Sequence, residues 1–276
     1  MLSNSWVPPE VISQKNITFA FMLSDFYATR SYDDPYYGRL MLQQKTMTVK
    51  TADDGSHYRD IQVVPIPFSS CKVGQNLFYP NVAEISEYNI GTYYCPDSTN
   101  LTLQGNFYSP VHSRVELIFK RCSDPYPTCA NETEFQAWVG GVTMIQIMIS
   151  TQFDINDYET PIKYYMEDVY YPLLSNYGIQ STIWYKKNFM NLYDNVFGLF
   201  NTKTTDYFYQ MNSQTYLVAD PDTGPGTGYY FYQMFKMDAE VDTYTRSVYT
   251  IMGVAKDTGG FYNALFFVGL FLYSRF

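Results

Sequence analysis

Apolar and polar residues alternate along much of the 276-residue chain with the period of β-strands. In residues 113–121, Val115, Leu117 and Phe119 recur at every second position, so one side of an extended segment is apolar. Residues 143–153 form a continuous apolar run, which is typical of a central strand buried on both faces. Further strands are predicted at residues 17–24, 39–50, 61–66, 100–108, 178–190, 207–211 and 229–237.

Turn-forming residues separate several of these strands. Asp53-Asp54-Gly55 follows the strand at 39–50, and Ser109-Pro110 predicts a hairpin between 100–108 and 113–121. Fewer segments have helical spacing. We predict a short helix at 132–139, a second helix at 160–174 that begins with Pro161, and an amphipathic segment at 244–256.

The end of the chain is apolar, and residues 258–274 contain no charged side chain. The run is slightly shorter than the roughly 20 residues of a full membrane span and contains Asn263. Its aromatic start suits a membrane interface, so we predict an anchor; the alternative is a buried C-terminal helix. The predicted anchor residues are Phe261, Leu265, Phe266, Phe267, Val268, Leu270, Phe271 and Leu272.

These patterns predict a β-rich α+β ectodomain, with antiparallel sheets and a few short helices, followed by a C-terminal membrane helix. We expect the ectodomain at residues 1–243, with a candidate seam at 154–159. Residues 244–276 would form the amphipathic lead-in and a truncated membrane helix.

Composition narrows the choice of partners. The net charge is -9 and only 16 % of residues are charged, so we expect no nucleic-acid partner. Aromatic residues make up 19 % of the chain, with 29 Tyr and 20 Phe, which favours strands with half-buried rings. A Tyr-rich, acidic surface suits contact with other proteins or with carbohydrate.

The chain has four cysteines, an even number that suggests two disulfides formed outside the cytosol. Three pairings are possible. We favour Cys71–Cys95 and Cys122–Cys129, because the turn at residues 124–127 can bring the second pair together. The alternative is four buried thiols. No Cys-x-x-Cys pair or histidine cluster predicts zinc, and we expect no metal and no cofactor.

Three sequons, at Asn16, Asn100 and Asn131, are candidate acceptors of N-linked glycans, with Asn131 in the most turn-rich context. No signal peptide follows Met1, so we expect an export element upstream of it.

Candidate catalytic chemistry is sparse. Two Asp-Thr-Gly triplets, at 222–224 and 257–259, match the triplet of aspartic proteases but lie too close together for two protease lobes. We interpret the first as a loop and the second as the start of the membrane helix. His57 and His112 are expected at the surface without a nucleophile partner. We therefore expect no catalytic residue and no enzyme.

A series of short motifs resembles a large set of transmembrane proteins of ciliates. The motifs are Leu103-Gln104-Gly105-Asn106-Phe107-Tyr108, Cys122 with Cys129, Phe153-Asp154, Tyr158, Pro161-Ile162, Tyr244-x-Arg246-x-x-Tyr249 and Gly259-Gly260-Phe261. The resemblance runs from about Cys71 to the end. It implies a cysteine-containing ectodomain between two membrane helices, of which the first is absent here, and it supplies no activity.

We therefore expect a non-catalytic, disulfide-bonded, N-glycosylated ectodomain at the cell surface, with the cilium as a candidate place and the secretory-pathway lumen as the alternative. Its expected partners are the membrane and either copies of itself or other surface proteins. The alternative function is the ectodomain of a two-pass channel subunit that is gated by a ligand or by force.

Overall fold

The computed structural model describes residues 10–12, 17–97, 101–124, 127–197, 203–222 and 226–274. The strands are β1 (Glu10–Ile12), β2 (Thr18–Ser24), β3 (Gly38–Thr51), β4 (His57–Pro65), β5 (Phe68–Ser70), β6 (Tyr94–Pro96), β7 (Leu101–Leu103), β8 (Val111–Arg121), β9 (Thr143–Phe153), β10 (Ile162–Pro172), β11 (Gly178–Tyr193), β12 (Thr204–Ala219), β13 (Tyr229–Met237) and β14 (Thr243–Ser247). The helices are α1 (Val82–Ser86), a 3-10 turn at Ile90–Thr92, α2 (Glu132–Val139) and α3 (Ile251–Tyr273).

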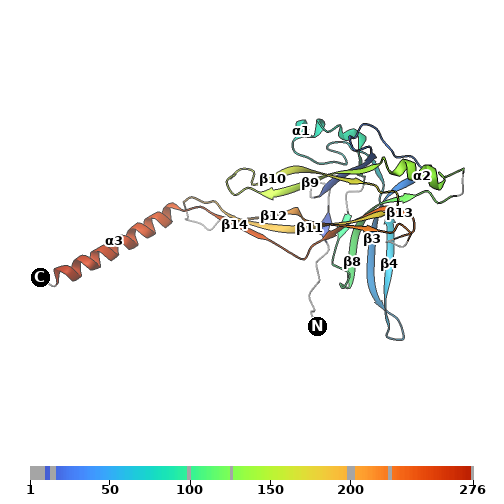
Figure 1. Ribbon diagram of the computed structural model, residues 1–276. Coiled ribbons are helices and arrows are strands. Elements are labelled where there is room, and N and C mark those ends of the chain that lie inside the picture. Colours follow the sequence, from blue (N-terminus) through green and yellow to red (C-terminus); the bar gives the residue numbers. More distant parts are fainter. Residues whose placement is uncertain are drawn as a thin grey trace.

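Two sheets form the body of the protein (Figure 1). The main sheet has the order β12-β11-β13-β8-β3-β4, with β14 paired to β11, and the small sheet has the order β10-β9-β2-β6-β5. The pairs are antiparallel except that β11 runs parallel to β13 and β14. A short pair, β1 with β7, forms a third sheet.

The core lies between the inner face of the main sheet and the small sheet. Phe19 of β2 stacks on Phe235 of β13 with ring centroids 4.4 Å apart. A buried hydrogen bond of 2.7 Å from Gln146 Nε2 to Gln233 Oε1 joins the two layers. Val115, Leu117 and Phe119 of β8 all enter this core, as their spacing predicts.

The opposite face of the small sheet is covered by residues 71–93, which include α1 (Figure 1). Leu77 and Ile85 from this segment pack with Ile145 and Ile147 of β9. β9 is therefore buried on both faces, as predicted from its unbroken apolar run.

Most predicted elements are confirmed, but the strand predicted at 100–108 is limited in the described chain to β7, which pairs with β1 and meets β8 only at the single bridge Gln104–Ser113, so the predicted hairpin is wrong. The helix predicted at 160–174 is also wrong. This segment is strand β10, which pairs with β9 from Ile162 to Pro172. Its residues include Tyr164, Tyr165, Tyr170 and Tyr171, and aromatic residues favour a pleated surface. Pairing along the whole of β9 overrides the local helical spacing. The segment at 244–256 is likewise divided between β14 and α3 instead of forming one amphipathic element.

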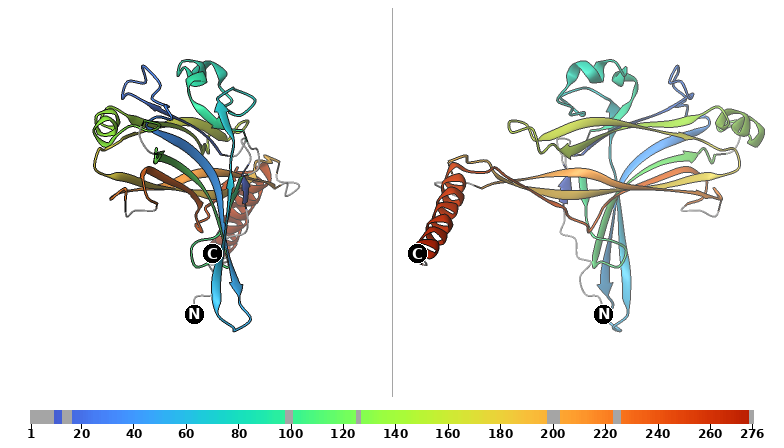
Figure 2. Two further views of the ribbon diagram at one scale, coloured as in Figure 1. Left: turned by 90° about the vertical axis from the view of Figure 1, so that its right-hand side faces the viewer. Right: turned by 60° about the vertical axis from the view of Figure 1, so that its left-hand side comes forward.

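The apolar end forms α3, a helix of 23 residues that extends away from the body (Figure 1 and Figure 2). All eight predicted anchor residues lie in it, and each is at least 47 % exposed. The alternative of a buried C-terminal helix is therefore wrong. Across the described ranges, no helix combines the length and the apolar character needed to cross a membrane.

Candidate functional site

The outer face of the main sheet, which points away from the small sheet, carries a concentration of positive charge. We define the basic face as five cations and one carboxylate on the adjacent strands β3, β8 and β13. They are Arg39 and Lys45 of β3, Arg114, Glu116 and Lys120 of β8, and Lys236 of β13. The face has a formal charge of +4, in a chain whose net charge is -9.

Two like-charged pairs lie directly across β3 and β8. Arg39 is the register partner of Lys120, and Lys45 is the register partner of Arg114. Like charges in directly opposed positions destabilise a sheet. The two pairs are six residues apart along each strand, which corresponds to about 20 Å.

Glu116 partly compensates the charge of the second pair from a buried position, with 1 % of the residue exposed. Its carboxylate accepts hydrogen bonds from Arg114 Nε at 2.7 Å, from Gln43 Nε2 at 2.7 Å and from the Tyr232 hydroxyl at 2.5 Å. Lys45 Nζ lies 3.9 Å away. Burial opposes ionisation, but these partners outweigh it and lower the pKa of Glu116.

Burial and the surrounding positive charge lower the pKa of both Lys236 and His112. Burial and the neighbouring Arg114 lower the pKa of Lys236 to about 8, and its Nζ lies 5.0 Å from the ring centroid of Trp184. His112, only 1 % exposed, has a pKa lowered to about 4 by burial and then by Arg114, Lys236 and Arg59. Neither ring nitrogen of His112 has a hydrogen-bond partner among the described residues.

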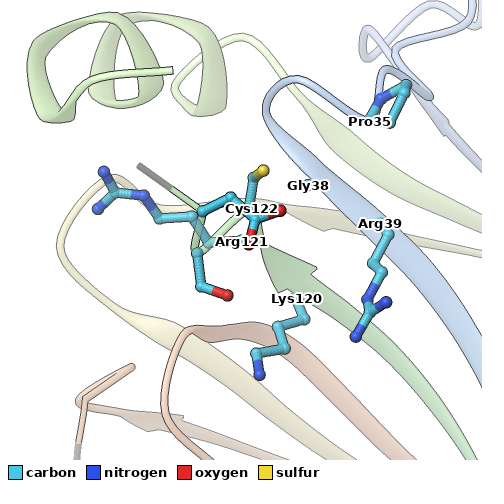
Figure 3. A pocket seen from close by; sticks show the side chains of 8 residues that line it. Pro35, Gly38, Arg39, Lys120, Arg121 and Cys122 are labelled. Carbon is cyan, nitrogen blue, oxygen red and sulfur yellow. The ribbon is translucent and has the colours of Figure 1, made fainter. Parts of the chain in front are cut away.

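The basic face continues into a groove at the end of β8, which we call the disulfide groove. One cavity there, of about 270 Å³, is lined by Pro35, Gly38, Arg39, Lys120, Arg121, Cys122, Ser123 and Asp124 (Figure 3). Figure 3 shows Arg39 and Lys120 projecting to the same side, while Arg121 points the other way. A Cβ on Gly38 would lie 2.6 Å from the carbonyl oxygen of Lys120, so glycine is required at this wall.

Two neighbouring cavities extend the groove past Arg121. One, of about 360 Å³, shares Lys120 and Asp124 with the first, and the other, of about 290 Å³, reaches Tyr177 and Tyr230. Arg121 is held by an ion pair with Glu132 of α2. Arg39 and Lys120 have no ion-pair partner in the part of the chain that the structure describes.

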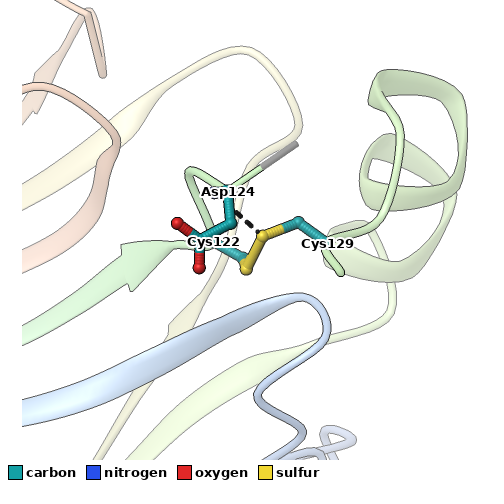
Figure 4. Close-up of side chains that lie close together, drawn as sticks. All are labelled: Cys122, Asp124 and Cys129. Carbon is teal, nitrogen blue, oxygen red and sulfur yellow. Dashed lines mark hydrogen bonds between the residues drawn. A yellow bond between two sulfur atoms is a disulfide. The ribbon is translucent and has the colours of Figure 1, made fainter. Parts of the chain in front are cut away.

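The Cys122–Cys129 disulfide cross-links the wall of the groove (Figure 4). The backbone N–H of Asp124 donates to Cys129 Sγ at 3.1 Å. The two sulfurs and the Asp124 carboxylate lie within 4.8 Å of one another, which is a spacing that suits a metal ion. Because the sulfurs are bonded to each other, they offer no thiolate to a metal.

Both favoured disulfides are confirmed. Cys71–Cys95 joins β6 to the segment over the small sheet, and Cys122–Cys129 follows β8. Two disulfides in a β-rich domain fit a secreted or extracellular domain.

The sequons are distributed unevenly over the described chain. Asn131 is exposed and caps α2, with its Oδ1 accepting from the Glu134 N–H at 2.9 Å. Asn16 and Asn100 lie outside the described residues.

Sequence reasoning missed the basic face. His112 was expected at the surface and is buried in the middle of the main sheet, where its register partner on β3 is Met47. His57 is exposed, as expected. One signal was present in the sequence: three adjacent strands carry seven Lys and Arg residues and a single acidic residue. Reading that signal requires the strand order, which local patterns do not give.

A sequence model of the family described as "Uncharacterised 80 kDa protein N-terminal domain" matches residues 20–238. No curated protein matches the chain. No solved structure matches it either.

Proposed function

The chain belongs to this family of uncharacterised 80 kDa protein N-terminal domains, and we propose that it is a non-catalytic extracytoplasmic domain attached to a membrane surface through α3. The observation that carries the proposal is the exposure of the apolar residues of α3. The two disulfides support a location outside the cytosol.

The apolar residues of α3 cover every direction around its axis. Leu265, Phe266, Phe267 and Val268 are consecutive, and successive residues of an α-helix point about 100° apart. Each of the four is at least 53 % exposed. A helix that is apolar on all sides requires apolar surroundings, whereas a groove on a partner protein covers a single stripe. Lipid is therefore the favoured environment.

The length of the apolar segment fits shallow insertion. Residues 261–273 rise about 20 Å in an α-helix, whereas the hydrocarbon core of a bilayer is about 30 Å thick. Lys256 and Asp257 precede this segment and would stay in the headgroup region. We propose that α3 enters one leaflet and holds the disulfide-bonded body at the surface, where it takes part in assembly with other surface molecules.

Asn131 completes the proposal as a glycan acceptor. Its Oδ1 is engaged in the cap of α2, and a glycan is attached to the side-chain nitrogen instead. A glycan at this exposed position is compatible with the helix cap.

Flotation with vesicles of phosphatidylcholine tests the proposal. These vesicles carry no net charge, so binding reports apolar insertion and not attraction to the basic face. We expect the full chain to float with the vesicles. Leu270→Lys should weaken binding by at least tenfold, because a lysine deep in the bilayer costs about 2.5–3.5 kcal/mol.

The matched control is Leu217→Lys, which makes the same change at a residue of β12 that is 60 % exposed. This variant should float like the unmodified chain. The proposal fails if the unmodified chain does not float, or if Leu217→Lys and Leu270→Lys reduce flotation equally.

A further inference from the structure

The basic face retains an unfavourable arrangement of charge that the fold does not need. Sheets avoid like charges in directly opposed positions, yet β3 and β8 contain two such pairs, Arg39 with Lys120 and Lys45 with Arg114. Local conflicts of this kind concentrate at functional sites, where a ligand supplies the missing partner. Here the missing partner is an anion.

The charge of the Lys45–Arg114 pair is partly compensated, and that of the Arg39–Lys120 pair is not. Glu116 Oε1 lies 2.7 Å from Arg114 Nε and 3.9 Å from Lys45 Nζ, so two cations share one carboxylate. Arg39 and Lys120 form no ion pair in the described chain, although Asp124 lines the same cavity and Lys120 Nζ lies 5.9 Å from the ring centroid of Tyr229. His112 is buried at the other end of β8, two residues from Arg114, and neither of its ring nitrogens has a hydrogen-bond partner in the described chain.

The Arg39–Lys120 pair lies in a cavity, that of the disulfide groove, which could hold a ligand. Arg39 and Lys120 line its cavity of about 270 Å³, together with Ser123 (Figure 3). The cavity therefore offers a bound anion the cations of Arg39 and Lys120 and the hydroxyl of Ser123, while one carboxylate, that of Asp124, also lines it. Because the two cation pairs lie about 20 Å apart along the strands, a ligand that satisfies both pairs is extended and carries more than one negative charge.

We propose that the basic face and the disulfide groove bind an acidic polysaccharide, a linear sugar chain that carries sulfate or carboxylate groups. Tyr229, half-buried beside Lys120, stacks on Tyr232 with ring centroids 6.0 Å apart and places an aromatic side chain next to the cations, as sites for sugars often do. The two disulfides favour an extracellular ligand over a nucleic acid. The proposal does not depend on insertion of α3.

Binding of a heparin oligosaccharide to the full chain in a non-ionic detergent tests the proposal without vesicles. We expect binding that weakens as salt increases, since it releases counterions. The double variant Arg39→Gln/Lys120→Gln should weaken binding at least tenfold and reduce the slope of log Kd against log salt by about two, one for each cation removed. Lys45→Gln, a second variant at the other pair, should weaken binding severalfold.

The matched control is Arg30→Gln/Lys72→Gln, which removes one Arg and one Lys from exposed positions outside the basic face. We expect it to bind within twofold of the unmodified chain. The exchange Arg39→Lys/Lys120→Arg preserves both charges and should retain binding. Neutral dextran should not compete.

Three results would overturn the proposal. The first is no binding of heparin by the unmodified chain at low salt. The second is an equal loss of affinity in the control double variant. The third is competition by poly-glutamate as strong as that by heparin at equal charge, which would assign the face to an acidic protein. None of these results bears on flotation with neutral vesicles, so the two proposals fail separately.

Discussion

The two faces of the main sheet both bury side chains, but they bury different chemistry. The inner face places Leu117, Phe231 and Phe235 against the small sheet, each no more than 2 % exposed. The outer face buries Glu116 and His112 to the same degree, among cations and a tyrosine hydroxyl. One strand, β8, serves both faces through its alternating residues.

This difference separates stability from recognition. Apolar burial on the inner face is favourable in proportion to its area and needs no particular partner. A buried charge on the outer face must be matched, and removal of its partner leaves an unpaired ion in a poorly solvated site. The inner face therefore holds the layers together, and the outer face is arranged for an ionic ligand.

The largest effect is expected on the inner face. Phe231 is fully buried, and its ring centroid lies 5.1 Å from that of Tyr171. Phe231→Ala should lower the free energy of unfolding by about 3–5 kcal/mol, because the cavity cannot close between two sheets. Urea denaturation measures this change. Met41→Ala, at a half-buried position on the outer face, should cost about 1 kcal/mol. An equal loss in both variants would remove the distinction between the faces.

Low pH should destabilise the fold through His112 on the outer face. The pKa of His112 is lowered to about 4, chiefly by burial, whereas the unfolded chain binds this proton near the usual histidine pKa of about 6.5. As pH falls between these values the unfolded state gains a proton that the folded state does not, so stability decreases, by up to about 3 kcal/mol. The free energy of unfolding, measured by denaturation across this window, should follow that slope.

His112→Gln provides the control, because glutamine does not titrate. The slope between about pH 6.5 and about pH 4 should be largely lost in this variant. The pKa of Glu116 is lowered from its usual value of 4.5, so its contribution to stability is present above that value and is lost only at lower pH. An unchanged slope in His112→Gln would show that other groups cause the acid sensitivity.

The inner face was largely predictable from the sequence, because its information is local. The alternation of Val115, Leu117 and Phe119 identifies both the strand and its buried side. The continuous apolar run of β9 indicates burial on two faces. The strand β10 was not predictable in this way, since its conformation is imposed by pairing with β9.

The basic face on the outer side was not predictable, because its charged residues become neighbours only through the order and register of the strands. Arg39 and Lys120 are 81 positions apart in the chain, and only the register between β3 and β8 makes them neighbours. The parallel pairing of β11 with β13 then brings Trp184 beside Lys236. The two disulfides were predictable because the Cys122–Cys129 loop is short, which reduced three pairings to one favoured choice.

The smallest effect is expected to have the opposite sign. Arg39→Gln/Lys120→Gln removes a like-charged pair that lies directly across two strands, so it should raise the free energy of unfolding by about 0.2–1 kcal/mol. Urea denaturation at low salt should show the gain, and added salt should reduce it, because salt already screens the repulsion. A domain that becomes more stable when two residues are neutralised, and at the same time loses affinity for a polyanion, keeps those residues at a cost to its own fold. A loss of stability in this variant would instead mean that Arg39 and Lys120 support the sheet, and the two faces would then differ in chemistry but not in role.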